Sequence, residues 1–140
     1  MMNIRDLLKK HCEINDAINA KLELIEELKS LATKVTSSVF AGGGGQGVSD
    51  RVGRTTARIV DLENEINEDI DHLVEIKAEI LGIVSALKDE REKAIIQRRY
   101  IQGQSWEKVA ESLGYSPRHI KRIHNRIIEN LEKLYGEAAG

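Results

Sequence analysis

The 140-residue sequence contains one cysteine, one proline and few aromatic residues, and each shortage restricts the class of protein. The single Cys12 cannot form an internal disulfide and lacks the neighbours of a zinc site. One proline and 4% aromatic residues favour long helices over strands. No apolar run approaches the roughly 18 residues that span a bilayer, and the N-terminus has no signal-peptide apolar region. We therefore expect a cytoplasmic protein of one or two small domains that does not act at a membrane and has no large enzyme cleft.

Charge is unevenly distributed along the chain, although the net charge is only −2. Residues 51–90 carry 5 basic and 10 acidic residues, whereas residues 91–126 carry 9 basic and 3 acidic residues. The second block therefore has a charge of +6 over 36 residues. A basic block joined to an acidic remainder is typical of a phosphate-binding module on a solvated helical part.

Apolar residues recur every three or four positions in two long series, which predicts two amphipathic helices. The first series spans residues 4–35, with His11 at an inward position, and the second spans 59–87 in a coiled-coil-like pattern. Neither apolar stripe is stable in water, so the two helices should pack on each other. We expect an antiparallel helical hairpin over residues 1–88, and further copies of the chain could also cover its stripes.

The glycine run between these helices matches nucleotide-binding patterns only superficially. Residues 42–47 satisfy G-x-G-x-x-G, but long helices stand where that fingerprint needs strands. The P-loop pattern fails because Val48 occupies the place of the phosphate-binding lysine. We interpret residues 37–50 as a Gly-rich loop that binds no cofactor, with Ser49 or Asp50 capping the next helix.

Residues 89–140 predict three helices joined by tight turns. Asp89 begins the first helix, of about 12 residues, which ends before Gly103. Ser105 caps the second helix, and Ser116 caps the third, where a proline occupies the first helical position. This order is that of a three-helix helix-turn-helix module, and it completes an all-α fold.

The turn between the second and third helices fits the helix-turn-helix pattern residue by residue. When Ala110 takes the fifth position of the twenty-residue pattern, Gly114 falls ninth, Ile120 fifteenth and Ile123 eighteenth, as the pattern requires. A small Ala110 allows close helix approach, and Gly114 permits the sharp turn. The predicted core of the module comprises Val109, Ala110, Leu113, Gly114, Ile120 and Ile123.

The third helix carries polar side chains on the face opposite its apolar residues. Arginine and asparagine can each make two hydrogen bonds to a base edge in the major groove of double-stranded DNA. We predict base contacts from Arg118, Lys121, Arg122 and Asn125. We predict phosphate contacts, from helix starts and flanking positions, by Ser105, Lys108, Ser116, His119 and Arg126.

The remaining candidate residues favour structural interpretations. His119 and His124 are five residues apart and so not on one helix face, which argues against a metal site and favours packing for His124. Trp106 and Tyr100 are more typical of core than of base stacking. Arg99 fits either a phosphate contact or a salt bridge to an acid within the module. No catalytic grouping emerges, so we expect no enzymatic activity.

Residues 91–131, REKAIIQRRYIQGQSWEKVAESLGYSPRHIKRIHNRIIENL, resemble the promoter-binding fourth region of bacterial sigma factors. Nearly the whole chain, including SDRVGRTTARIVDLENEINEDIDHLVEIKAEI, resembles small phage and prophage transcriptional regulators of the ArpU and RinA kind. That resemblance implies activation of late genes for packaging, morphogenesis or lysis together with host RNA polymerase. The chain has no counterpart of the sigma region that melts promoter DNA, so it does not predict autonomous initiation.

Three functions remain open from the sequence. The first is a phage-type activator whose head binds promoter DNA while its N-terminal helices form a homodimer or contact RNA polymerase. The second is a small terminase subunit, because such proteins also combine a helix-turn-helix with coiled-coil helices and assemble as large rings. The third is a helical protein-interaction module whose basic face binds no DNA.

Overall fold

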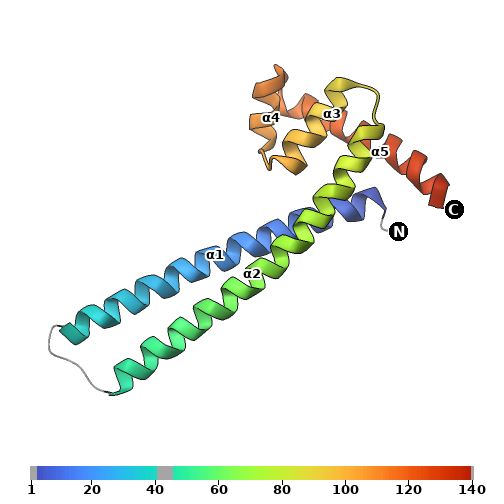
Figure 1. Cartoon of the computed structure of the whole chain (residues 1–140). Coiled ribbons are helices and arrows are strands. Elements are labelled where there is room, and N and C mark those ends of the chain that lie inside the picture. The colour runs from blue at the N-terminus through green and yellow to red at the C-terminus, as the bar shows by residue number, and fades with distance from the viewer. Residues whose placement is uncertain (1–2, 41–45, 140) are drawn as a thin grey trace. The chain divides into compact units, whose positions relative to one another are not determined.

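The computed structural model describes residues 3–40 and 46–139, and helices joined by short turns make up this part of the chain. Within them there is no strand, and the predicted all-α class with a long helix pair before a helical module is confirmed (Figure 1). The elements, in chain order, are α1 (Ile4–Phe40), α2 (Gln46–Ala86), α3 (Glu90–Ile96), the π-helix η1 (Gln97–Ile101), α4 (Trp106–Leu113) and α5 (Pro117–Ala139). In the described part of the chain, no helix has both the length and the apolar character needed to cross a membrane.

The described chain divides into two compact units, and each of the two long helices contributes residues to both units. The hairpin unit is Ile14–His72, and the head unit combines Met1–Glu13 with Leu73–Gly140. The first turns of α1 and the last turns of α2 therefore belong to the head unit with α3, α4 and α5. The division at residue 88 stays a prediction, but the buried core of the head crosses that point.

In the hairpin unit, α1 and α2 run antiparallel, side by side (Figure 1). The Lys21 ammonium donates a hydrogen bond of 2.6 Å to Oδ2 of Asp69, which fixes which turns of the helices face each other. The seam between them buries Ile14, Ile18, Ile25, Leu62 and Ile66. Burial of these side chains stabilises two helices whose propensity alone would not hold them in water.

The predicted apolar stripes are wider than the seam that two helices can bury. Leu22 and Leu31 on α1 are 47% and 54% exposed, and Ile70 on α2 is 42% exposed. One partner helix covers only a narrow face of the other, so residues at the edges of a wide stripe stay in contact with water. The coiled-coil character of the pair stays a prediction.

The predicted start of the second long helix was wrong. The structure begins α2 at Gln46, so Ser49 and Asp50 lie inside the helix and do not cap it. Once a helix exists, each added residue gains a hydrogen bond, which offsets the low helix propensity of Gly47. The other glycines of the G-x-G-x-x-G match lie outside the described residues.

The head unit has one continuous hydrophobic core contributed by every helix of the unit. From α1 it includes Leu7, and from the end of α2 it includes Ile80. These pack with Ile95 of α3, Val109 of α4 and Ile127 of α5, and each of the five is at most 2% exposed. The helix that carries the predicted base-reading residues is therefore held by side chains from both ends of the sequence.

Candidate DNA-binding site

The first helix of the helix-turn-helix module begins and ends where it was predicted, but its last turn has a different geometry. Asp89 caps α3, and its Oδ1 accepts a hydrogen bond of 2.8 Å from the backbone N–H of Arg91. The α-helix α3 passes at Gln97 into the π-helix η1, in which the N–H of Gln102 donates to the carbonyl of Gln97, five residues earlier. The wider turn was not predicted, because no residue type marks a π-helix.

Both caps of the following helices are formed by the predicted serines. The Ser105 hydroxyl accepts a hydrogen bond of 3.1 Å from the N–H of Lys108 at the start of α4. The Ser116 hydroxyl accepts one of 3.2 Å from the N–H of His119 in α5. These side chains satisfy helix-end donors that would otherwise lack partners, and so fix where α4 and α5 begin.

Gly114 ends α4 in the left-handed conformation, with φ of 75°. The turn is closed by a hydrogen bond of 3.0 Å from the N–H of Tyr115 to the carbonyl of Ala110. A side chain at this φ brings its Cβ close to the backbone, whereas glycine has no such penalty. The angle between α4 and α5 depends on this one residue.

Replacing Gly114 with alanine should lower the free energy of unfolding by about 1 kcal/mol, because an L-residue is strained at positive φ. No atom lies within 4 Å of the added Cβ, so the cost comes from the backbone and not from a clash. Gly82→Ala is the matched control, since Gly82 is helical and equally uncrowded. That change should stabilise the protein by about 0.5–1 kcal/mol. Urea unfolding of both variants measures the difference, and two shifts of the same sign would contradict this account.

The residues predicted as the core of the module lie between α4 and α5. Val109 and Ile120 are fully buried, Ala110 is 1% exposed and Ile123 is buried as well. Leu113 is half-buried and packs against the same core. With Gly114 at the turn, these residues hold α5 against the other helices of the module.

The four side chains predicted to contact bases are all exposed on α5. They are Arg118, Lys121, Arg122 and Asn125. The opposite side of the helix is buried through Ile120, Ile127 and Leu131. Within the described residues no ion pair engages Arg118, Lys121 or Arg122. Three cations are thus presented to solvent on the helix that follows the turn, and contact with bases stays a prediction.

The residues predicted to contact phosphates lie at the starts of α4 and α5 and along α5. Ser105, Lys108, Ser116 and Arg126 are exposed. His119 is half-buried, with its ring 5.1 Å from that of Tyr115. Both serine hydroxyls accept a hydrogen bond from the backbone and keep their own proton for donation to an anion. Phosphate contact by the five residues also stays a prediction.

An aromatic and histidine cluster behind α5 was not found from the sequence. A hydrogen bond of 2.8 Å joins Oη of Tyr100 to Nε2 of His124, and the Trp106 ring lies edge-on, 4.7 Å from that of His124. Tyr100 is buried and Trp106 half-buried against the core, in agreement with the packing interpretation. The cluster links η1, α4 and α5, and no short sequence spacing signals it.

Of the two interpretations of Arg99, the salt bridge does not form within the described residues, and the phosphate contact stays a prediction. Its guanidinium donates a hydrogen bond of 3.0 Å to the backbone carbonyl of Gln104 and lies over the ring of Trp106, 4.7 Å from its centre. The cation therefore interacts with a carbonyl in the turn and with an indole face, and not with an acid among the described residues of the module. Arg99 thereby holds the turn between η1 and α4.

Burial keeps His124 neutral. Desolvation lowers its pKa from 6.5 to about 4, against an opposing hydrogen bond with Asn125. The pKa of His11, on α1 in the same unit, is also lowered by burial and by the nearby charges of Lys77 and Arg99. In the described parts of the chain, no three metal-binding side chains gather as they would around an ion.

Acid should therefore destabilise the head. In the unfolded chain His124 binds a proton near pH 6.5, whereas in the folded chain it does so only near pH 4. The free energy of unfolding is therefore unaffected by His124 above pH 6.5 and falls as the pH drops below that value. The shift corresponds to about 3 kcal/mol by pH 4. Urea unfolding followed by fluorescence of Trp106, the single tryptophan, measures it. His124→Gln should flatten the pH dependence between 6.5 and 4.5, and the exposed His72→Gln should not; equal profiles would contradict the assignment.

Comparison with known proteins identifies the module. Residues 89–133 match the family Sigma-70, region 4. No curated protein and no solved structure matches the chain. The match covers about a third of the chain and ends within α5, so it includes the caps, the Gly114 turn and every predicted DNA-contacting residue. The C-terminal part of this chain is therefore a helix-turn-helix module similar to region 4 of Sigma-70.

Proposed function

We propose that this chain is a sequence-specific, DNA-binding transcription regulator that reads the major groove with α5. The observation that carries the proposal is the exposed face of α5 in a module similar to Sigma-70 region 4. Arg118 and Arg122 can each bind the O6 and N7 acceptors of guanine, and Asn125 can bind adenine in the same two-point manner. Lys121 lies on the same exposed face.

The charge distribution supports the same function. The 36-residue block with a charge of +6 lies wholly within the matched segment, whereas the preceding block is acidic. Lysine and arginine at the edges of the face attract the DNA backbone, which supplies affinity and orientation without reading sequence. Ser105 and Ser116, at the starts of α4 and α5, place backbone N–H groups where a phosphate can approach.

We further propose that the regulator acts with host RNA polymerase as a phage-type activator of late genes. The support is the resemblance of the sequence to regulators of the ArpU and RinA kind. One recognition helix covers only a short half-site, so useful specificity needs polymerase or a second copy of the chain. In this role the protein is a binding protein and has no enzymatic activity.

Selection of the purified protein against a random duplex pool tests the proposal, with binding of the selected duplexes repeated at several salt concentrations. We expect one enriched motif, present once or twice per duplex, whose affinity exceeds that of random duplex at every salt concentration. Enrichment of no motif, with binding that only falls steeply with salt, would show a nonspecific phosphate-binding head and would refute sequence-specific regulation by α5 alone.

A further inference from the structure

One side of the hairpin unit exposes a row of leucines on α1. Leu24 and Leu31 are 37% and 54% exposed, and Leu28 between them is half-buried. The three, which we call the leucine stripe, step along the helix by four and three residues and therefore lie on one face. Exposed leucines that align in this way indicate an interface more strongly than the same leucines scattered over a surface.

Six exposed charged residues form a second row, on α2. They step by three and four residues, and their sign changes once along the row. The charge stripe consists of Arg51, Arg54, Arg58, Asp61, Glu65 and Glu68. Its first half is therefore wholly basic and its second half wholly acidic.

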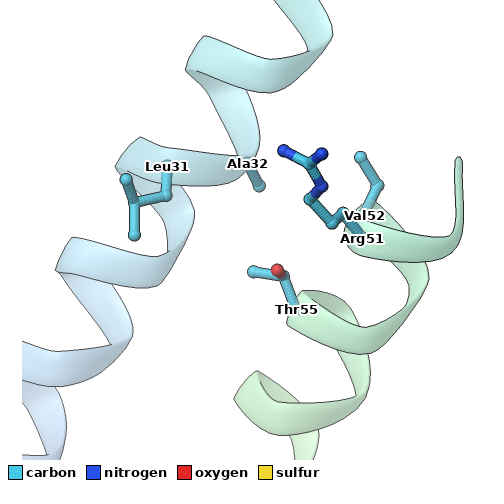
Figure 2. Close-up of a pocket in the computed structure, with 5 residues that line it drawn as sticks. All are labelled: Leu31, Ala32, Arg51, Val52 and Thr55. Carbon is cyan, nitrogen blue, oxygen red and sulfur yellow. The ribbon is translucent and has the colours of Figure 1, made fainter. Parts of the chain in front are cut away.

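The two stripes lie on the same side of the hairpin unit. Leu24 immediately precedes the buried Ile25, just as Glu65 immediately precedes the buried Ile66. In an antiparallel pair, residues that immediately precede the seam positions on the two helices share one side. Leu31 and Arg51 confirm this, because both line a hollow of about 250 Å³ between the two helices (Figure 2).

The charge stripe of one copy is complementary to the charge stripe of a second copy that runs in the opposite direction. A two-fold axis across the helices would place Arg51 opposite Glu68 of the second copy, Arg54 opposite Glu65 and Arg58 opposite Asp61. The same axis turns α1 against its own copy, with leucine stripe against leucine stripe. Counted from the Lys21–Asp69 pair, the sign change lies level with Leu31, so the axis brings Leu31 beside its own copy, and Leu28 and Leu24 lie further from the axis along the stripe.

We propose that two copies of this chain pair through this side of the hairpin unit, antiparallel, with leucine stripe on leucine stripe and charge stripe on charge stripe. The parallel arrangement has no such match, because a two-fold axis along the helices would bury the leucine stripe of one copy against the charges of the other. An antiparallel contact of this kind is closed, so it produces a dimer and not a ring. The interface is independent of DNA binding by the head.

Sedimentation equilibrium of the full chain without DNA tests the pairing, with two variants that each give the stripe a single sign. The all-acidic variant is Arg51→Glu, Arg54→Glu and Arg58→Glu, and the all-basic variant is Asp61→Lys, Glu65→Lys and Glu68→Lys. Each variant alone should raise the dimer dissociation constant roughly 10- to 100-fold, because every opposed pair becomes repulsive. An equimolar mixture should recover the wild-type constant or better. A wild-type monomer at 100 μM, or variants that dimerise as well as wild type, would overturn the proposal.

Disulfide trapping tests the orientation separately. In a Cys12→Ala background, a mixture of Arg54→Cys and Glu65→Cys chains should form the mixed disulfide, since the antiparallel axis brings these positions together. Disulfides between two Arg54→Cys chains in place of the mixed disulfide would show a different register or orientation and overturn the proposal. Ile70→Asn is the matched control, because this exposed side chain lies on the opposite side of the hairpin and should leave the dissociation constant within about two-fold of wild type. Circular dichroism of every variant shows that its helices are retained, so loss of pairing is distinguished from unfolding.

Discussion

Replacing both Arg118 and Arg122 with alanine is expected to lower affinity for the selected duplex roughly 30- to 20,000-fold, because each two-point contact with a guanine contributes about 1–3 kcal/mol of discrimination. Both side chains are exposed on α5, whose opposite side is buried in the core. Neither takes part in an ion pair within the described residues. Their removal therefore leaves the packing of the head unchanged. Fluorescence anisotropy with the selected and a scrambled duplex measures the ratio of specific to nonspecific affinity.

Lys133→Ala is the matched control for the loss of positive charge. Lys133 is exposed on the same helix but lies beyond the predicted contacts. Its replacement should weaken binding to the selected and scrambled duplexes alike, because a lost phosphate attraction carries no sequence information. If the double variant also weakened both duplexes equally, Arg118 and Arg122 would be phosphate contacts and base reading would have to come from elsewhere on the head.

The helix-turn-helix could be predicted closely because its determinants are local. Asp89, Ser105 and Ser116 cap helices through hydrogen bonds within three residues of themselves. The backbone at position 114 has a positive φ, which favours glycine. The buried position 110 lies where two neighbouring helices approach closely, which favours a small residue such as alanine. Features of this kind can be read from residue type and spacing alone, and the same holds for the two long helices and their antiparallel seam.

The features that sequence reasoning missed depend on contacts between distant segments or on backbone geometry without a residue signature. The Tyr100–His124 hydrogen bond joins residues 24 positions apart. Arg99 has a backbone carbonyl as its partner, and any residue could have supplied that carbonyl. The π-helix adds one residue to a turn, and no residue type marks it. The spacing of apolar residues likewise predicted the apolar faces of α1 and α2. It did not predict which residues of those faces stay exposed when the two helices pack.

The predicted division at residue 88 raises the question of whether the module folds without α1. Leu7 is 2% exposed and belongs to the same core as Ile80, Ile95 and Ile127. Arg5 of α1 also forms an ion pair with Glu132 of α5. The helix that presents the predicted base-reading residues therefore shares its core, and one ion pair, with a segment more than 80 residues upstream of the matched module.

Leu7→Asp should therefore abolish specific DNA binding, although Leu7 lies far in sequence from every predicted contact. An unpaired carboxylate in this core costs on the order of 4 kcal/mol or more, which approaches the whole stability of about 5–10 kcal/mol expected for a unit of this size. Trp106 emission during urea unfolding reports the head, and anisotropy reports binding to the selected duplex. Lys10→Asp, at an exposed position of the same helix, is the control and should leave both within error of wild type. If Leu7→Asp kept native Trp106 emission and full affinity, the sigma-like module would stand on its own from residue 89; if both are lost, α1 is part of the DNA-binding unit, and the first helix of the chain positions the last.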